Sequence, residues 1–186
     1  MALKPTTERN LDGYGAPPLS WTSVRELLAH GVGQITQAPG TGGPARHTCW
    51  LATAGPDGRP HVRPVGVLFT DGPAYFNTGV RTQKAKNLAR DARCALTVAT
   101  HPFDLVVEGV ARPVRDHAVV ERVAELFTAA GWSPSARDGL LYAEYSAPSA
   151  GPPPWQVYEM VPTSVHAFAT AEPSGATRWT VEDEPA

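Results

Sequence analysis

Residues 58–98 read GRPHVRPVGVLFTDGPAYFNTGVRTQKAKNLARDARCALTV. Within them, His61–Thr70 and Ala74–Thr78 are rich in apolar and aromatic residues and are separated by a short Gly- and Pro-containing turn, which predicts two strands. Helical spacing begins at Thr82, and a strand-like run returns at Cys94–Ala99. Strands at short spacing joined by turns indicate an antiparallel barrel rather than a parallel α/β sheet.

Upstream of this stretch, the sequence predicts an arm and a helix. Residues 1–19 contain several Pro and Gly without apolar periodicity, which predicts an extended N-terminal arm outside the core. In SWTSVRELLAHG the apolar residues recur at helical spacing, with Ser20 placed as the N-cap and Gly31 just past the end. We expect this helix to lie on the core.

A loop and a hairpin come next. QAPGTGGPAR at 37–46 predicts a flexible loop. His47–Ala54 predicts a strand, and Asp57-Gly58 within the turn PDGR joins it to His61–Thr70. These two strands are expected to form a β-hairpin.

Downstream, strands and helices alternate. Helices are predicted from Thr82 to about Arg90 and from Asp116 to about Ala130, because apolar residues recur on one face of each. In the Pro- and Ser-rich stretch 131–154, RDGLLYAEY is a candidate for a short helix. Further strands are predicted at 105–114, 155–161, 164–169 and 176–181, and residues 182–186 are expected to be a solvated tail.

Length and composition exclude several classes of protein. A chain of 186 residues fits one domain, and 42% hydrophobic with 18% charged residues is typical of a globular protein. The formal charge of −2 disfavours a general nucleic-acid or acidic-membrane surface. No apolar run approaches the roughly 18 residues of a membrane span, and MALKPTTERN lacks a signal-peptide hydrophobic region. We therefore expect a cytoplasmic protein that binds neither nucleic acid nor membranes.

Common catalytic and metal sites are not found in the sequence. Cys49 and Cys94 form no CxxC pattern and are expected to be buried, reduced thiols. The six histidines are scattered without ligand spacing, so no metal is predicted. GxSxG and the phosphate loop GxxxxGK[ST] are missing, and the GxGxxA match at 40–45 contains Pro44 and precedes a strand, which contradicts a dinucleotide-binding turn.

The remaining candidate is a strand, a turn and a basic helix. The free N–H groups and positive dipole end at the start of a helix favour a bound anion, and Arg81 and Lys84 lie at that start. Thr78 and Thr82 add hydroxyl donors, and Lys84 shares a helix face with Asn87. The alternative is a solvated surface helix whose basic residues serve solubility, and spacing alone favours this simpler interpretation.

The hairpin, YFNTG at 75–79 and the helix containing KAKNL at 84–88 resemble the pyridoxamine 5′-phosphate oxidase-like superfamily, the flavin-binding split β-barrels. The resemblance runs from about residue 20 to the C-terminus and is strongest over 58–98. It implies a mainly β (α+β) fold: an antiparallel split β-barrel with Greek-key-like topology and flanking helices over residues 20–181.

The resemblance also implies a set of cofactor-binding residues. In the superfamily, one strand lines the flavin ring and a lysine of the following helix binds the cofactor phosphate. By position, Lys84 would bind phosphate, with Arg81 and Asn87 beside it. Gln83 replaces the arginine that the biosynthetic oxidase commonly has before that lysine, and Arg81 is expected to compensate. The other positions are Arg63, Pro64, Val65 and Gly66 beside the ring, and Asn77 and Thr78 near the ribityl chain.

The C-terminal ATRW at 176–179 resembles the ending of the actinobacterial branch, whose members use FMN or the deazaflavin coenzyme F420. Arg178 and Trp179 are therefore candidates to cover or hydrogen-bond the cofactor, although a tryptophan ending a barrel is equally a core residue. The Arg- and His-containing substrate motif of the vitamin-B6 oxidase is not found, which disfavours pyridoxine phosphate as the substrate.

Other residues leave alternatives open. His61 and Arg63 face the same side of one strand, and we favour a site role for Arg63 only. Glu108 is a candidate to lie inside the barrel and bond either the flavin or a neighbouring strand. An aromatic group is more consistent with the core or an interface than with a substrate wall; it comprises Trp132, Tyr142, Tyr145 and Trp155.

The leading hypothesis is a homodimeric oxidoreductase with FMN, or alternatively coenzyme F420, at the subunit interface. It transfers hydride or electrons to or from a small organic substrate, and no side chain need act as a catalytic acid because the cofactor carries the chemistry. The alternative is a non-enzymatic split-barrel carrier or accessory protein. A haem-binding relative is a third hypothesis, although no histidine is marked as an axial ligand.

Overall fold

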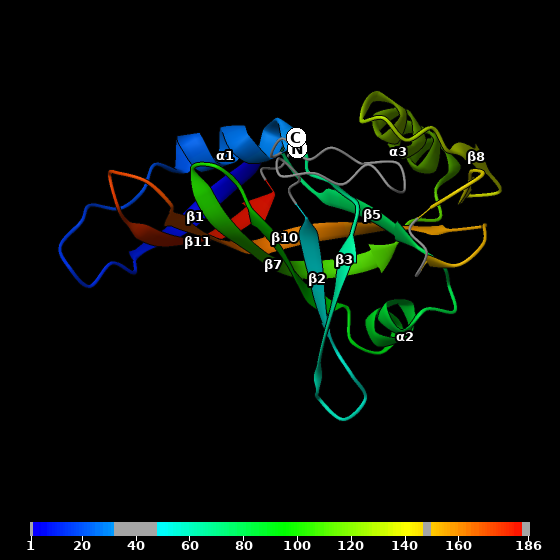
Figure 1. The fold of residues 1–186 in the computed structure, drawn as a ribbon, viewed down its shortest axis with the longest axis horizontal. Coiled ribbons are helices and arrows are strands. Elements are labelled where there is room, and N and C mark those ends of the chain that lie inside the picture. The colour runs from blue at the N-terminus through cyan, green and yellow to red at the C-terminus, as the bar shows by residue number, and fades with distance from the viewer. Residues whose placement is uncertain (1, 32–47, 147–149, 184–186) are drawn as a thin grey trace.

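The computed structural model describes residues 2–31, 48–146 and 150–183, and shows an antiparallel sheet with three flanking helices in this part of the chain (Figure 1). In this view α1 and α3 lie toward the top, and α2 lies at the bottom beside the β2–β3 hairpin. The helices are α1 Trp21–Ala29, α2 Gln83–Arg90 and α3 His117–Ala129. The strands are β1 Leu3–Asn10, β2 Cys49–Ala54, β3 Pro60–Val65, β4 Val67–Leu68, β5 Ala74–Thr78, β6 Arg93–Ala99, β7 Phe103–Pro113, β8 Ser135–Arg137, β9 Leu140–Tyr142, β10 Gln156–Ala169 and β11 Ala176–Asp183.

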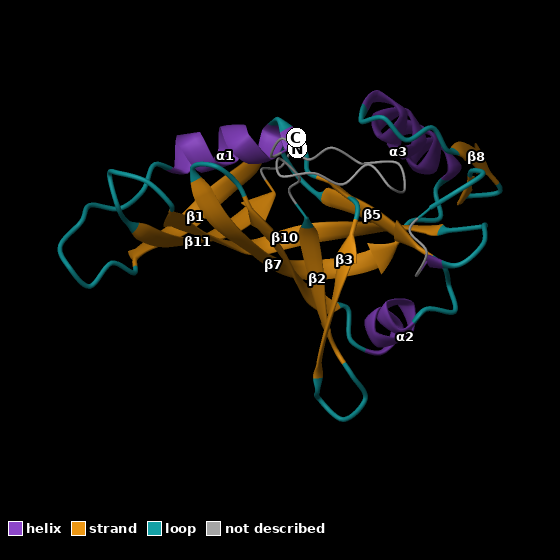
Figure 2. Ribbon diagram, viewed as in Figure 1, coloured by secondary structure: helices purple, strands orange, loops and turns teal. Residues whose placement is uncertain are grey.

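The main sheet confirms the antiparallel, mainly β architecture (Figure 2). Its strands follow the order β1-β11-β10-β7-β6-β2-β3, and β5 pairs with both β10 and β4. The long strand β10 divides the sheet, because its first half pairs with β5 and β7 and its second half with β7 and β11. One half of β10 therefore belongs to the barrel, and the other carries β11 and β1 as a wing.

The barrel closes at Gly66. The single strand predicted for 61–70 is two strands, because the chain changes partner there: Val65 pairs with Cys49, whereas Val67 pairs with Phe76. Glycine is common at such bends because it has no side chain to pack. The two strands predicted at 155–161 and 164–169 are, conversely, the one strand β10 with a register shift between Pro162 and Ser164.

The core follows the alternation of the strands. In β2, Cys49, Leu51 and Thr53 are buried, whereas Trp50 is exposed on the other face. Inside the barrel, Phe76 and Tyr158 stack with ring centroids 5.3 Å apart. A second apolar cluster lies under α3 around Trp132 and Trp155, confirming these two tryptophans as core residues.

Two segments differ from the sequence predictions. The helix proposed within 137–145 is wrong: β8 and β9 form a hairpin, with Asp138 (φ 52°) and Gly139 (φ 72°) as its left-handed turn. Within the expected arm, Leu3–Asn10 form the edge strand β1, which pairs with β11 and buries Leu3. Residues 37–46 and 184–186 lie outside the described residues, and Glu182 and Asp183 end β11.

Helices α1 and α3 begin at capping residues, of which Ser20 was predicted as an N-cap and Asp116 as the start of its helix. Ser20 accepts a hydrogen bond from the Ser23 amide at the start of α1, and Asp116 accepts one from Val119 at the start of α3. Arg25 of α1 donates two 2.6 Å hydrogen bonds to Asp71, which fixes the helix to the turn between β4 and β5. None of the helices in the described ranges is long and apolar enough to cross a membrane.

Both cysteines are free and buried, as predicted. Burial raises the pKa of Cys49 and of Cys94 to about 12. At pH 8 only about one thiol in ten thousand is then a thiolate, the reactive form. We expect neither thiol to react with a disulfide reagent such as DTNB in the native protein, and both to react in denaturant. Rapid reaction of the native protein, followed by absorbance, would contradict this burial.

Candidate functional site

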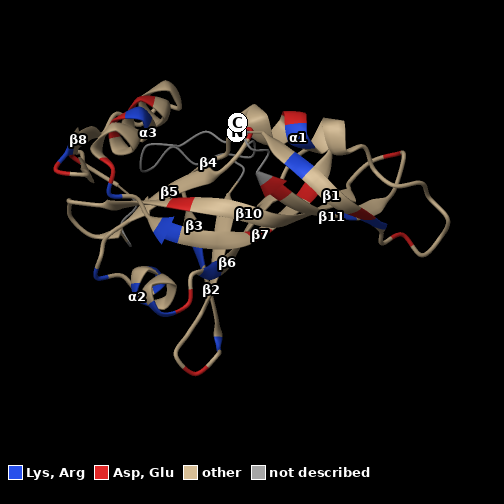
Figure 3. Cartoon of the chain, turned by 180° about the vertical axis from the view of Figure 1, so that it is seen from behind, with Lys and Arg blue, Asp and Glu red and all other residues tan. Residues whose placement is uncertain are grey.

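The candidate site lies where β3, the end of β5 and the start of α2 meet. β3 is an edge strand of the main sheet and presents exposed residues, including Val62, Arg63 and Pro64. In Figure 3 the blue segments on α2 and the turn before it mark their basic residues. An open strand edge next to a basic helix start is therefore the main feature of this side of the molecule.

The start of α2 is fixed to the end of β5. Thr82 is the N-cap, and its hydroxyl accepts a 3.3 Å hydrogen bond from the Ala85 amide and contacts the Thr78 hydroxyl at 3.0 Å. Gly79 lies between them, and a Cβ there would overlap the carbonyl oxygen of Ala150. The backbone of the turn is therefore held in place before any ligand binds, as an anion-binding helix terminus requires.

A second set of contacts ties α2 to the β2–β3 hairpin. Asn87 is 1% exposed. Its side chain donates a 3.0 Å hydrogen bond to the Thr53 hydroxyl and accepts a 2.8 Å hydrogen bond from the side-chain amide of Gln83. Arg90 donates to the carbonyl oxygens of Ala54 and Gly55 at 2.5 and 2.6 Å. These contacts hold Lys84 at a fixed position relative to β3.

Asn87→Ala tests this attachment. The substitution removes a buried amide and leaves the Thr53 hydroxyl without its donor, which we expect to lower the free energy of unfolding by about 1–3 kcal/mol. Urea unfolding followed by circular dichroism measures the loss. Lys86→Ala, on an exposed position of the same helix, is the control and should change stability by less than about 0.5 kcal/mol. Equal losses of unfolding free energy in Asn87→Ala and Lys86→Ala would show that Asn87 does not hold α2 to the hairpin.

Lys84 is a buried cation without a counter-ion among the described residues. It is 5% exposed, and no carboxylate in the described ranges pairs with it. Burial, and then the nearby Arg63 guanidinium, lower the pKa of Lys84 below its ordinary value. A buried charge without a partner destabilises the native state. The arrangement fits an anion that binds from outside and neutralises Lys84.

The neighbouring strand adds a second polar group. His61 faces the same side as Arg63, and its pKa is lowered by burial, by Arg63 and by Lys84. Its Nδ1 is buried without a hydrogen-bond partner. Lys84 and Arg63 therefore make a local concentration of positive potential in a protein whose overall charge is −2.

The other predicted residues of this region have different environments. Thr78 is fully buried and Asn77 half-buried on β5, whereas Arg81 is exposed before α2. Val65 is half-buried on the side of Arg63, and Gly66 is exposed at the bend. Pro64 pairs with Trp50 and so faces the opposite side of the sheet. The structure thus brings Arg63 near Lys84 and Thr78 into contact with the N-cap Thr82 of the same helix, whereas no contact among the described residues joins Arg81 to them.

Arg178 and Trp179 do not join this group within one chain. They lie on β11, which β10, β7, β6 and β2 separate from β3. Trp179 is fully buried against Trp21, and its indole N–H donates to Glu8 at 3.0 Å. Arg178 pairs with His166 in register and lies on the outer face of the sheet, so the two neighbours face opposite sides.

Glu108 also lies on the outer face, where it bonds neighbouring strands. Ser164 donates a 2.6 Å hydrogen bond to its carboxylate, and His166 Nε2 lies 3.4 Å away. The Ser164 hydrogen bond is the main cause of the lowered pKa of Glu108, with His166 and Arg178 adding to it. Of the two roles considered for Glu108, the structure shows the bond to a ladder neighbour.

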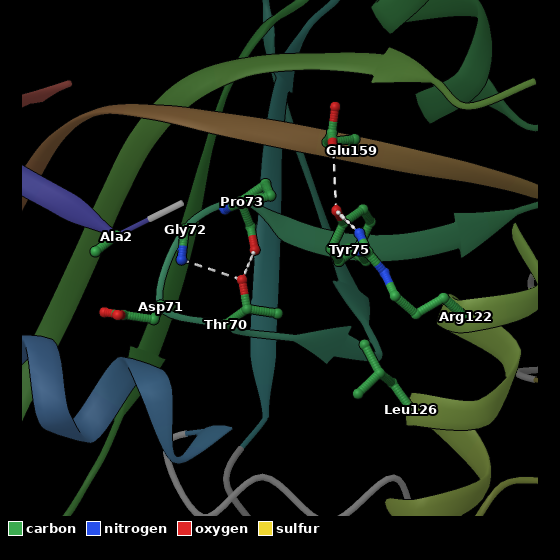
Figure 4. Close-up of a pocket in the computed structure, with 9 residues that line it drawn as sticks. All are labelled: Ala2, Thr70, Asp71, Gly72, Pro73, Tyr75, Arg122, Leu126 and Glu159. Carbon is green, nitrogen blue, oxygen red and sulfur yellow. Dashed lines mark hydrogen bonds between the residues drawn. The ribbon is translucent and has the colours of Figure 1, made fainter. Parts of the chain in front are cut away.

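A separate pocket of about 590 Å³ lies between α3, the 70–73 turn and Ala2 (Figure 4). Tyr75 donates a 2.9 Å hydrogen bond to Glu159, and Arg122 contacts the Tyr75 hydroxyl at 3.4 Å. Thr70 donates to the Pro73 carbonyl oxygen at 2.5 Å. These polar groups bond one another, and they lie apart from Lys84. No group of three or more His, Cys, Asp or Glu in the described part of the chain is placed to hold a metal.

Comparisons with known proteins identify the family. The family model described as pyridoxamine 5′-phosphate oxidase matches residues 43–169. The conserved hypothetical protein Rv2991 from Mycobacterium tuberculosis is 18% identical, with 85% of this chain and 89% of that one covered and a TM-score of 0.56. A NimC/NimA family protein from Clostridium acetobutylicum is 16% identical, with 72% and 82% covered and a TM-score of 0.50. No curated protein matches the chain.

At these identities the solved structures show the fold alone, whereas the family model covers more than half of the sequence. The split-barrel resemblance inferred from the hairpin and the KAKNL helix is thereby confirmed. The chain belongs to the pyridoxamine 5′-phosphate oxidase family.

Proposed function

We propose that the protein is an oxidoreductase that binds FMN, with the cofactor phosphate held by Lys84. The observation that carries this proposal is the buried Lys84 ammonium, which has Arg63 beside it and no carboxylate partner among the described residues. A phosphate monoester carries nearly two negative charges at neutral pH and accepts hydrogen bonds on three oxygens. A phosphate therefore satisfies both the charge and the hydrogen-bonding capacity of Lys84 and Arg63.

FMN is favoured over the deazaflavin by the size of the anion site. Its terminal phosphate is compact and needs only the start of α2, where Thr82 and the first helical amides lie beside Lys84. Coenzyme F420 carries a long acidic tail and needs an extended basic groove. The exposed Arg81 and Lys86 supply some positive charge for such a tail, which keeps coenzyme F420 as the alternative.

In this proposal the protein binds and orients, and the cofactor, when bound, supplies the hydride and electron transfer. Lys84 and the α2 terminus hold the phosphate end. The edge of β3 offers backbone donors and acceptors for the polar edge of the ring, with Arg63 at the rim. No acid or base among the side chains is needed for binding, which agrees with a site made of cations and amides.

We also propose that two copies of the chain pair through the outer face of the sheet. This face presents three large apolar side chains to solvent: Trp50 (43% exposed), Val62 (43%) and Phe168 (39%). Trp50 and Val62 are diagonal neighbours on β2 and β3, and adjoining exposed apolar side chains favour protein–protein contact. Arg178 lies on the same face and belongs to the surface that a second copy would cover, whereas Trp179 faces the core.

Titration of the purified protein with FMN and with coenzyme F420, followed by absorbance and fluorescence, tests the cofactor. We expect saturable FMN binding at one per chain and weaker binding of the deazaflavin. Tighter binding of the deazaflavin would make coenzyme F420, rather than FMN, the proposed cofactor. Reduction of the bound cofactor followed by reoxidation with candidate acceptors then separates an enzyme from a carrier. Binding of neither cofactor by folded protein would overturn the proposal and favour a non-enzymatic barrel.

A further inference from the structure

A pocket of about 640 Å³ lies beside the β8–β9 hairpin and shares no lining residue with the pocket at Tyr75. Its lining comes from residues 131–133 after α3, from the hairpin and residues 143–145 that follow it, and from Pro153. Lys84 is not among the residues that line it. Pockets that bind small molecules span roughly 300–1,000 Å³ and are lined mainly by apolar and aromatic side chains. This pocket therefore has the size for an organic ligand.

Trp132 gives this pocket an aromatic surface that is fixed from below. It is 8% exposed, packs edge-on against Phe127 of α3 with ring centroids 5.1 Å apart, and lies 5.8 Å from Trp155. Its indole N–H donates a 3.0 Å hydrogen bond to the carbonyl oxygen of Tyr145. This bond holds the backbone at Tyr145, whose side chain lines the pocket and is 41% exposed. Two aromatic side chains are therefore presented to a ligand before it binds.

Arg137 supplies the positive charge of the pocket. Its guanidinium carbon lies 4.6 Å from the centroid of the Tyr142 ring. Both side chains are on the outward face of the hairpin, because Ser135 pairs with Tyr142 and Leu141 is fully buried on the opposite face. A guanidinium stacked on a ring keeps its N–H donors at its edge. Within the described part of the chain these donors bind no carboxylate.

Glu144 is the one carboxylate among the residues that line the pocket. It is exposed and forms no ion pair with Arg137. The charge of Arg137 is therefore left for a ligand, whereas the charge of Glu144 opposes any anion that enters. The two residues act on an anionic ligand with opposite sign, which a neutral ligand would not detect.

We infer that this pocket binds a planar aromatic carboxylate, with its ring against Trp132 and Tyr145 and its carboxylate on Arg137. A guanidinium matches a carboxylate with two parallel hydrogen bonds, and an aromatic ring packs well on the edge or face of another. Tyr142 acts as a positioning residue, because it carries the guanidinium. The inference goes beyond the proposed cofactor and does not depend on it, since the pocket contains none of the residues assigned to FMN.

Isothermal titration of the flavin-free protein with naphthoate, and with its neutral amide naphthamide, tests the carboxylate. Arg137→Gln is expected to weaken naphthoate binding about tenfold, because a charge-assisted pair is lost, and to leave naphthamide binding unchanged. Glu144→Gln is expected to strengthen naphthoate binding about two- to fivefold, because it removes a like charge at an exposed position. Arg9→Gln, on an exposed position of β1 at one end of the main sheet, is the matched control and should change neither.

Two further variants separate positioning from contact. Tyr142→Leu removes the ring under Arg137 and is expected to weaken naphthoate binding about two- to fivefold, whereas Tyr142→Phe keeps the ring and should bind like wild type. Tyr145→Ala removes an aromatic wall, so naphthoate and naphthamide should both weaken by about two- to tenfold.

The outcomes are distinct from those for the cofactor. Failure of naphthoate to bind at millimolar concentration would overturn the inference. So would naphthoate binding that Arg137→Gln leaves unchanged, or an equal loss of naphthoate and naphthamide in that variant, because either result removes carboxylate recognition. If the folded protein binds no flavin yet shows these responses to naphthoate, the FMN assignment fails and the aromatic carboxylate pocket stands.

Discussion

Replacing Lys84 by Met is expected to weaken FMN binding by about 10- to 150-fold, equivalent to about 1.5–3 kcal/mol for a lost charge-assisted hydrogen bond. Met is close in length to the apolar stem of lysine, so the buried space at position 84 stays occupied. Riboflavin, which lacks the phosphate, should bind equally well to wild type and variant. Isothermal titration with both ligands measures the difference.

The same substitution has an opposite effect on the ligand-free protein. The pKa of Lys84 is lower in the folded than in the unfolded chain, so the charged form destabilises the fold at every pH below the folded value. This destabilisation disappears as the pH rises through the folded pKa toward 10.5, the ordinary value for lysine. At pH 7 the variant should therefore be at least as stable as wild type. Its advantage in stability should shrink as the pH rises through the folded pKa of Lys84 toward 10.5.

Thermal unfolding of both proteins without ligand, between pH 7 and 10, checks the sign. Lys86→Met, on an exposed position of α2, is the matched control and should alter neither stability nor FMN affinity strongly. A variant at position 84 that binds FMN normally, or that loses FMN and riboflavin together, would exclude Lys84 as the phosphate ligand.

Trp179→Ala is expected to lower the free energy of unfolding by about 3–5 kcal/mol, the range for removing a large aromatic side chain from a core. Trp179 is fully buried, packs against Trp21 with ring centroids 5.4 Å apart and donates to Glu8. Its loss leaves a cavity under α1 and a carboxylate without its donor. Trp179→Phe refills part of the cavity and should recover part of the loss.

Urea unfolding monitored by far-UV circular dichroism gives these values. Tyr14→Ala is the control, because Tyr14 is a fully exposed aromatic residue and its removal should cost less than about 0.5 kcal/mol. If Trp179→Ala instead left stability unchanged while abolishing FMN binding, the side chain would act as a cofactor cover despite its burial.

Elements with strong local signals were predictable from the sequence. β5 has the predicted bounds Ala74–Thr78, since an apolar run lies between a Gly-Pro turn and Gly79. α1 and α3 begin directly after their capping residues, Ser20 and Asp116. Each of these signals depends only on residues close in the chain, which is why one sequence suffices.

Elements that depend on distant partners were not predictable. β1 has one buried apolar residue, Leu3, and is a strand because the edge of β11 pairs with it far along the sequence. The apolar run Leu140–Tyr142 suits a helix or a strand by composition, and the Asp138-Gly139 turn decides for a hairpin. An Asp-Gly pair is the local sequence signal for such a hairpin turn.

The candidate site shows the same division. The proposed phosphate-binding role of Lys84 was predicted from its place at a helix start, and the structure adds that Lys84 is buried and has no carboxylate partner among the described residues. The prediction that His61 and Arg63 face the same side of one strand is confirmed by the register of β3 with β2. Arg178 is a cofactor candidate only through a second subunit, since the sheet order that separates β11 from β3 is a property of the whole fold.

The pairing of β1 with β11 constrains how the chain folds during synthesis. Thr7 and Thr180 share a hydrogen bond across 173 positions, and Trp21 of α1 packs against Trp179. At about 5–20 residues per second, the ribosome needs roughly 9–35 s to make that intervening length. The pairing partner of β1 and the Trp179 contact of α1 are therefore made only late in synthesis, long after the Asp71 turn to which α1 also binds.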